Sequence, residues 1–120
     1  MKYMLLIYME PNAMNETERE HCYVESTQVA QDLNASGQYV AANPLHPTST
    51  ATSVRVRDGK RLVTDGPFAE TREHLGGYYL IDAKDLDEAI GIAARHPGAR
   101  VGTVEIRPVM EVPGLPAGPC

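Results

Sequence analysis

The chain has 120 residues, with 11 Lys and Arg against 16 Asp and Glu and a formal net charge of -5. This length suits one domain with a single core and excludes two domains of ordinary size. The acidic balance leaves no excess of basic residues to neutralise a phosphate backbone, so we do not expect nucleic acid as a direct partner. With one Phe and no Trp, aliphatic side chains must build most of the core.

Secretion and membrane insertion are not expected. The two cysteines, Cys22 and Cys120, are too few and too far apart for a secreted disulfide framework. The apolar run at residues 3–9 is short for a signal peptide, and no small-residue cleavage site follows it. No apolar stretch approaches the roughly 20 residues that cross a bilayer. We therefore expect a cytoplasmic protein.

The first predicted elements are a strand and a long helix. Residues 2–9 (KYMLLIYM) are apolar on both alternating faces, which suits a strand covered on both sides. Asn15 and Glu18 have the spacing of a capping box, and Gly37 is a typical stop signal. This pattern predicts a helix over residues 16–36.

A hairpin gives the strongest local signal in the middle of the chain. Residues 39–42 form a short strand, and two strand-like runs at 53–57 and 60–64 then flank the Asp58-Gly59 dipeptide. An Asp-Gly pair between such runs predicts a β-hairpin with a two-residue turn. Residues 65–75 follow as a loop, or as a loop with a short helical turn after Pro67.

The last elements repeat the strand, helix, strand pattern. Residues 77–82 form a strand, and Asp85 with Glu88 has the spacing of a second capping box. The apolar spacing that follows predicts a helix packed on a sheet, which Pro97-Gly98 ends. Residues 103–107 alternate apolar with charged side chains and form a half-exposed final strand.

This element order predicts an α+β fold of the ferredoxin-like type, in which two β-α-β units are separated by an inserted hairpin. The sheet is antiparallel, and both helices lie on one face. Because the first strand is apolar on both faces, the other face needs a cover, and we predict a homodimer by sheet-to-sheet packing, a dimeric α/β-barrel-like assembly. Residues 1–112 form the domain and residues 113–120 a loose Pro- and Gly-rich tail.

The loop after the hairpin holds the candidate chemistry. Its turn formers Asp65-Gly-Pro-Phe68 present one large ring, and three charged side chains follow at Glu70, Arg72 and Glu73. A rigid backbone with mixed charges suits a binding site, and His46 and Asp65 could form an acid and base pair at the end of the sheet. The alternative is a structural loop, in which Asp65 caps the backbone, Phe68 plugs the core or the dimer seam, and His46 is a surface residue.

Metal and cofactor motifs are not found. The four histidines lack zinc-site spacing, and no phosphate-binding or dinucleotide-binding glycine motif occurs. Glu18, His21 and Glu25 share one helical face, but the second helix has no matching ligands, which favours a solvated face. Cys22 lies between the two glutamates, which would raise its thiol pKa, and is a core residue rather than a nucleophile. His96 is expected to interact with the last helix carbonyls.

Several segments together carry a family resemblance. They are Met1–Tyr8, Thr50–Gly59, Thr64–Thr71 (TDGPFAET), Glu73, Leu75–Asp82 (LGGYYLID), Asp87–Ala89 and Val104–Val109 (VEIRPV). On these segments the chain resembles the DGPF-type proteins of the YCII-related family. The resemblance implies a dimeric ferredoxin-like fold in a bacterial family whose members mostly have no assigned activity.

The resemblance also implies two kinds of role. Distant YCII-related proteins include a dehydrochlorinase acting on chlorinated hydroxyquinols, in which a His and Asp pair is implicated. The Asp would here be Asp65, and the candidates for the His are His21 and His46. DGPF-type proteins are often encoded beside extracytoplasmic-function sigma factors, which implies a regulatory or accessory role.

Two functions are therefore predicted as alternatives. The first is a small-molecule binder or enzyme, with a pocket between sheet and loop. Its lining would be Tyr8, Phe68 and Tyr79, with ionisable groups from His46, Asp65, Glu70, Arg72 and Glu73, and it would use no metal or cofactor. The second is a non-catalytic regulatory protein, in which the acidic surface meets a basic partner such as a sigma factor.

Overall fold

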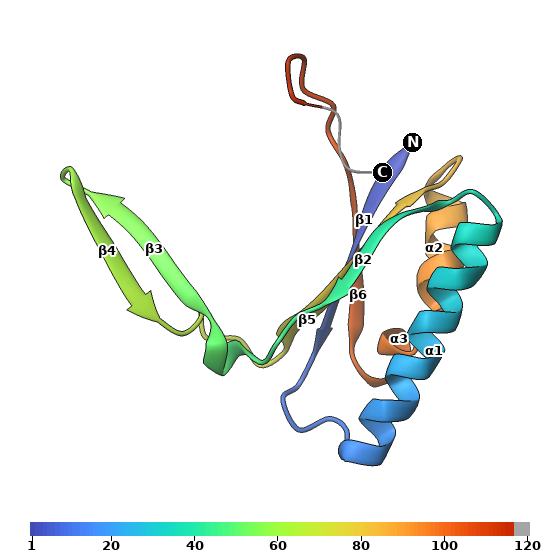
Figure 1. The fold of residues 1–120 in the computed structure, drawn as a ribbon, viewed down its shortest axis with the longest axis horizontal. Coiled ribbons are helices and arrows are strands. Elements are labelled where there is room, and N and C mark those ends of the chain that lie inside the picture. Colours follow the sequence, from blue (N-terminus) through green and yellow to red (C-terminus); the bar gives the residue numbers. More distant parts are fainter. Residues whose placement is uncertain (117–120) are drawn as a thin grey trace.

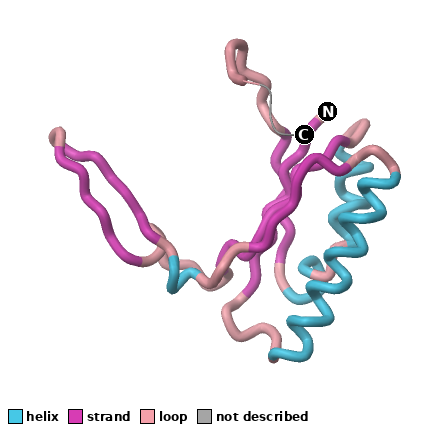
Figure 2. Tube along the Cα trace, viewed as in Figure 1, coloured by secondary structure: helices cyan, strands magenta, loops and turns pink. Residues whose placement is uncertain are grey.

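The structure, a computed structural model, describes residues 1–116 and has an α+β fold (Figures 1 and 2). Its elements are β1 (Lys2–Met9), α1 (Glu16–Ala35), β2 (Tyr39–Pro44), the 3-10 helix η1 (Thr48–Thr50), β3 (Thr52–Arg57), β4 (Lys60–Asp65), β5 (His74–Asp82), α2 (Leu86–Arg95), α3 (Gly98–Val101) and β6 (Thr103–Pro108). The predicted order of strands and long helices is confirmed. The short elements η1 and α3 were not predicted.

The main sheet has the order β2-β5-β1-β6, with antiparallel neighbours throughout. β5 lies between β1 and β2, and β1 lies between β5 and β6, so each β-α-β unit is split by a strand of the other. This is the predicted ferredoxin-like arrangement. All three helices lie on one face of the sheet (Figure 1).

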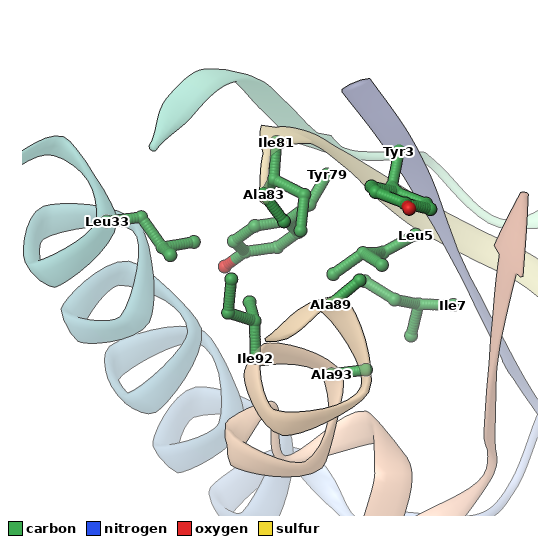
Figure 3. Close-up of a cluster of buried hydrophobic side chains, with 10 residues drawn as sticks. All are labelled: Tyr3, Leu5, Ile7, Leu33, Tyr79, Ile81, Ala83, Ala89, Ile92 and Ala93. Carbon is green, nitrogen blue, oxygen red and sulfur yellow. The ribbon is translucent and has the colours of Figure 1, made fainter. Parts of the chain in front are cut away.

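Strand alternation divides the central strands between the two faces of the sheet. In β1, Tyr3, Leu5 and Ile7 are buried beneath the helices, whereas Met4, Leu6 and Tyr8 are only half-buried on the open face. The helix-facing residues form the core, which Figure 3 shows. Its members are Tyr3, Leu5, Ile7, Leu33, Tyr79, Ile81, Ala83, Ala89, Ile92 and Ala93. A face built from aliphatic residues is thus left without a cover in this single chain.

The first predicted capping box is confirmed and the second is only half formed. The Glu18 N–H donates to Asn15 Oδ1 at 2.8 Å, and the Asn15 N–H donates to Glu18 Oε1 at 3.1 Å. At α2 the Glu88 N–H donates to Asp85 Oδ1, but the Glu88 carboxylate accepts from the Lys84 N–H rather than from Asp85. The same carboxylate accepts from the Gln38 amide, a long-range contact that local spacing cannot predict.

Replacing Asn15 by Ala should lower the free energy of unfolding by about 1 kcal/mol, because it removes the side-chain oxygen that accepts the capping bond from the Glu18 N–H. Asn34→Ala near the other end of α1 is the matched control, since Asn34 is exposed and its side chain is in no hydrogen bond to another described residue. Urea unfolding followed by circular dichroism measures both values. Equal midpoints for the two variants would contradict the expectation.

Within residues 1–116, strands β3 and β4 pair only with each other, and they project as an arm from the body (Figure 1). We call residues 52–65 the arm. The predicted turn is confirmed, because Asp58 and Gly59 both have positive φ angles of 53° and 72°, as a type I′ turn requires. The arm leaves the sheet on the side opposite to the helices.

The segment between the arm and β5 agrees with one of the two predicted alternatives and differs from the prediction at its end. It is a loop without a helical turn after Pro67. β5 begins at His74 rather than Gly77, because Met9 pairs with His74 beyond a bulge at Ile7 and Tyr8. The last two residues of the predicted loop therefore belong to the sheet.

After β6 the described chain has no regular element up to residue 116, and the rest of the predicted tail, residues 117–120, lies outside the described residues. Among the described residues, no helix is long and apolar enough to span a membrane.

Candidate functional site

A cavity of about 540 Å³ lies between α1 and the helix-facing side of the sheet. Ile7 and Met9 of β1, Ala42 of β2 and Leu75 of β5 contribute to its apolar wall. Its size is typical of small-molecule sites, which are concave and mostly apolar with a few polar groups.

Small residues on both walls make room for this cavity. Cys22, Ser26 and Ala30 line it from α1 at a spacing of four residues, so they share one helical face. Gly76 and Gly77 line it from β5 and carry no side chain. At Gly77 a methyl group would lie 3.0 Å from the Asn43 carbonyl oxygen, which explains why the close approach of β2 requires glycine.

His96 is the buried polar group of the cavity, with 5% of its surface exposed. It follows the last residue of α2, and its Nδ1 accepts a hydrogen bond from the Gly98 N–H at 2.9 Å. Because a backbone N–H is always a donor, Nδ1 must be unprotonated and the neutral ring carries its proton on Nε2. Burial, the main cause, lowers the pKa of His96 to about 4, while Glu25 raises it and Arg100 lowers it.

His96 lines the cavity, and its Nε2 atom is not sealed in the core. Nε2 forms no hydrogen bond to another described residue. Among the described residues, every side-chain nitrogen or oxygen without a partner has some contact with solvent. Nε2 therefore retains access to solvent through the cavity. At neutral pH the cavity thus has an uncharged N–H donor at its wall without a protein acceptor.

Tyr79 holds α1 against the sheet beside His96. Its hydroxyl donates to the Ser26 carbonyl oxygen, and its ring meets the His96 ring edge-on with centroids 5.0 Å apart. Burial, the main cause, raises the pKa of Tyr79 to about 12, so the phenol stays protonated. The hydroxyl is already used as a donor, which leaves its oxygen as an acceptor in the cavity wall.

A second polar group lies where η1 meets the first residue of β5. Thr48 Oγ1 and His74 Nδ1 are 3.0 Å apart, and both residues line the cavity together with the exposed His46. These residues come from the segment between β2 and the arm and from the start of β5. Sequence analysis assigned His46 to a site but did not select Thr48 or His74.

The structure separates the site residues predicted from sequence. Tyr79 and His46 line the cavity, whereas Tyr8, Arg72 and Glu73 line an open hollow with Glu105 and Thr103 of β6. Tyr8 and Tyr79 lie on opposite faces, because Tyr79 pairs with the helix-facing Leu5 while Tyr8 has the alternate orientation in β1. A single pocket lined by both tyrosines is therefore not formed within one chain.

The remaining predicted residues lie outside both spaces. Phe68 is 79% exposed, and Asp65 and Glu70 are also exposed and line neither the cavity nor the hollow. No hydrogen bond joins Asp65 to His46 or to another described side chain. In the hollow, Arg72 forms an ion pair with Glu10, and the Thr103 hydroxyl donates to Glu73 at 2.8 Å.

The helix face considered for a metal has another role. Glu25 accepts two hydrogen bonds of 2.7 Å from Arg100 of α3 and so joins α1 to α3. Within residues 1–116, no group of three potential metal ligands comes together. The pKa of the Cys22 thiol is raised, chiefly by burial, with Glu25 contributing in the same direction. His96 was expected to bind helix carbonyls through its side chain, but its ring instead accepts from Gly98 in the core.

Comparison with known proteins places the chain in a family. The YCII-related domain family model matches residues 1–113. The chain belongs to this family. An uncharacterised YCII-related relative from Rhizobium meliloti (strain 1021) is 37% identical over 118 residues, which cover 91% of this chain and 92% of the relative. The narrower DGPF-type assignment stays a prediction from residues 65–68.

A solved structure with a similar fold is the 5-chloro-2-hydroxyhydroquinone dehydrochlorinase of Burkholderia phenoliruptrix AC1100 in complex with 2,5-dihydroxybenzoquinone. The match has a TM-score of 0.57 and covers 93% of this chain and 96% of the dehydrochlorinase. Sequence identity is 11%, so this likeness shows the fold alone.

Proposed function

We propose that the protein binds a small ring compound carrying an oxygen acceptor in the cavity between α1 and the sheet. The observation that carries this proposal is the uncharged His96 N–H, which has no acceptor among the described residues and is accessible from a mostly apolar cavity. Water in the cavity is the acceptor open to this N–H, and a ligand oxygen would replace that water. The dehydrochlorinase with a bound dihydroxybenzoquinone supports a ring compound as the ligand class.

His96 would act as a neutral hydrogen-bond donor. Its low pKa means that the imidazole, not the imidazolium, faces the ligand at pH 7. A neutral imidazole N–H can polarise a carbonyl or hold a phenolate oxygen without giving up its proton. If the bound compound is also converted, we assign the proton-accepting role to His46 or His74, which line the other polar part of the cavity.

Binding of 2,5-dihydroxybenzoquinone, followed by calorimetry and thermal unfolding, tests the proposal. At ten times Kd the probe should raise the free energy of unfolding by about 1.4 kcal/mol. His96→Phe removes the donor and should weaken binding about tenfold, since one hydrogen bond contributes about 1.5 kcal/mol. His21→Phe on the exposed side of α1 is the matched control and should bind like the wild type.

Two outcomes would decide against parts of this proposal. Unchanged affinity in a folded His96→Phe variant would remove His96 from the site. Stabilisation by the probe that survives both Asp65→Asn and His46→Ala would remove the acid and base pair expected from the sequence. A change in the absorption spectrum of the probe on incubation would distinguish turnover from binding alone.

The open face of the sheet supports a homodimer as part of the proposal. Met4 and Leu6 of β1 and Tyr78 and Leu80 of β5 lie on this face and are half-buried. Packing the sheets of two copies face to face would remove this apolar surface from water. The regulatory role beside a sigma factor stays a prediction from the family resemblance, and no contact in the structure favours it.

A further inference from the structure

The arm exposes two chemically different faces. Val54 and Val63 are directly opposite each other, and Val56 lies next on the same face; their exposed fractions are 60%, 60% and 61%. Arg55 and Arg57 alternate with these valines and occupy the other face. Arg61 lies opposite Val56 on the valine face, and Leu62 lies opposite Arg55 on the other face. The arm is therefore a basic ribbon whose valine face is in solvent.

An isolated two-stranded ribbon of this kind is marginally stable in water, because it needs further strands or a helix to cover an apolar face. Here the strands of the arm pair only with each other. The radius of gyration is 16.1 Å, against about 14 Å for a compact chain of this length. Three exposed valines on a projecting ribbon indicate that another surface covers the arm.

Charge identifies that surface. The arm has four basic residues and two acidic ones, which leaves seven basic and fourteen acidic residues in the rest of the chain. A basic arm and an acidic body attract each other, but within one chain the arm is directed away from its own body (Figure 1). A second copy supplies the same acidic body in a position that the arm can reach.

The direction of the arm agrees with this partner. The arm extends on the side of the sheet that no helix covers, where a second copy would pack (Figures 1 and 2). Six residues per strand span about 20 Å, whereas packed sheets are about 10 Å apart. The arm is thus long enough to pass the edge of the facing sheet and reach the body of the other copy.

We propose that the arm of each copy lies along the body of the second copy, with its valine face and Arg61 against that body and its net positive charge attracted by the acidic residues there. This inference rests on the sheet-to-sheet dimer proposed above and adds a second contact to it. It does not depend on the ligand, so failure of ligand binding leaves it intact.

Charge reversal on the arm tests the contact by sedimentation equilibrium of the full chain. Arg55→Glu with Arg57→Glu should weaken the dimer by at least about tenfold in Kd, because the arm changes from four basic and two acidic residues to two basic and four acidic ones, and its attraction to the acidic body becomes repulsion. Lys84→Glu with Arg95→Glu makes the same change in net charge on the helix side and should leave Kd within about twofold of the wild type. Equal Kd values for the two double variants would overturn the inference.

A further double variant tests the valine face while keeping the ribbon folded. Val54→Thr with Val63→Thr retains β-branched side chains and strand propensity but reduces the apolar surface. This variant should also weaken the dimer by about tenfold. A Kd equal to that of the wild type would count against burial of the valine face.

Cross-linking locates the arm directly. Lys60 at the tip is one of three lysines in the chain, so zero-length coupling of amines to carboxylates in a mixture of ¹⁵N-labelled and unlabelled protein can be assigned without ambiguity. We expect mixed-isotope pairs that join Lys60 to an acidic residue of the other copy. Exclusively intrachain products, or none from Lys60, would overturn the inference.

The two proposed contacts can fail separately. Leu80→Asp places a charge on the open face of the sheet and should dissociate the dimer. If it does so while the arm variants have no effect and Lys60 forms no mixed-isotope pair, the sheet-to-sheet dimer stands and the arm contact falls. A wild-type protein that sediments as a monomer at micromolar concentration would overturn both.

Discussion

Replacing Gly102 by Ala is expected to lower the free energy of unfolding by about 3 kcal/mol or more. Gly102 follows α3 and precedes β6, where the chain passes close to the end of β1. A methyl group at this position would lie 2.0 Å from the Tyr8 carbonyl oxygen and 2.9 Å from Met9 Cβ. Because the nearest atom belongs to the backbone of a central strand, no side-chain rotation relieves the overlap.

Gly91→Ala is the matched control and should have the opposite sign. Gly91 lies within α2, and no atom lies within 4 Å of the position its methyl group would take. Replacing a glycine inside a helix by Ala should stabilise the protein by about 0.5–1 kcal/mol. Urea unfolding gives both values, and a Gly102→Ala variant within 0.5 kcal/mol of the wild type would show that β1 and β6 separate more easily than their packing suggests.

Stability is expected to fall as the pH drops from about 6.5 to 4 through the ionisation of His96. The folded pKa lies below the unfolded one, so the unfolded chain binds the proton first and is favoured as the pH falls. The contribution of His96 is therefore complete above about pH 6.5 and is lost toward pH 4. We expect a loss of about 2 kcal/mol, since solvent reaching Nε2 through the cavity reduces the burial penalty.

His96→Gln removes this titration and isolates it from that of the carboxylates. The difference in unfolding free energy between wild type and variant should decrease as the pH falls from 7 to 4. His21→Gln is the control for the His-to-Gln replacement itself, because His21 is exposed on α1. Parallel profiles for wild type and His96→Gln would mean that His96 is not buried in its neutral form.

Much of the fold follows from local patterns in the sequence. The Asn15 and Glu18 spacing correctly predicts the start of α1, and the Asp58-Gly59 pair correctly predicts the turn of the arm. These features depend on residues one to three positions apart, which the sequence displays directly. The bulge that extends β5 to His74 was missed, because it depends on pairing with β1, nearly seventy residues earlier.

The site was less accessible to sequence analysis. Tyr79 and His46 were selected and do line the cavity, but His96 was assigned to helix carbonyls. The glycine two residues after His96 was a usable signal, because the imidazole packs against it and leaves no room for a side chain there. A methyl group at Gly98 would lie 2.9 Å from His96 Nδ1 and 2.7 Å from Ile7 Cγ2. The four-residue spacing of Cys22, Ser26 and Ala30 was a second signal, because small side chains on one helical face leave space between the helix and the sheet.

By itself, the sequence determined the element order, the split antiparallel sheet and a first strand with two apolar faces. Its size and acidity led us to expect one domain and no nucleic-acid partner, and against this acidity the arm stands out as basic. Only the tertiary structure decided that Tyr8 and Tyr79 lie on opposite faces of the sheet, and that His96 is buried beside Tyr79 and Gly98. Those outcomes depend on how distant segments pack, because burial, and with it the pKa of a histidine, is a property of the assembled layers rather than of neighbours in the chain.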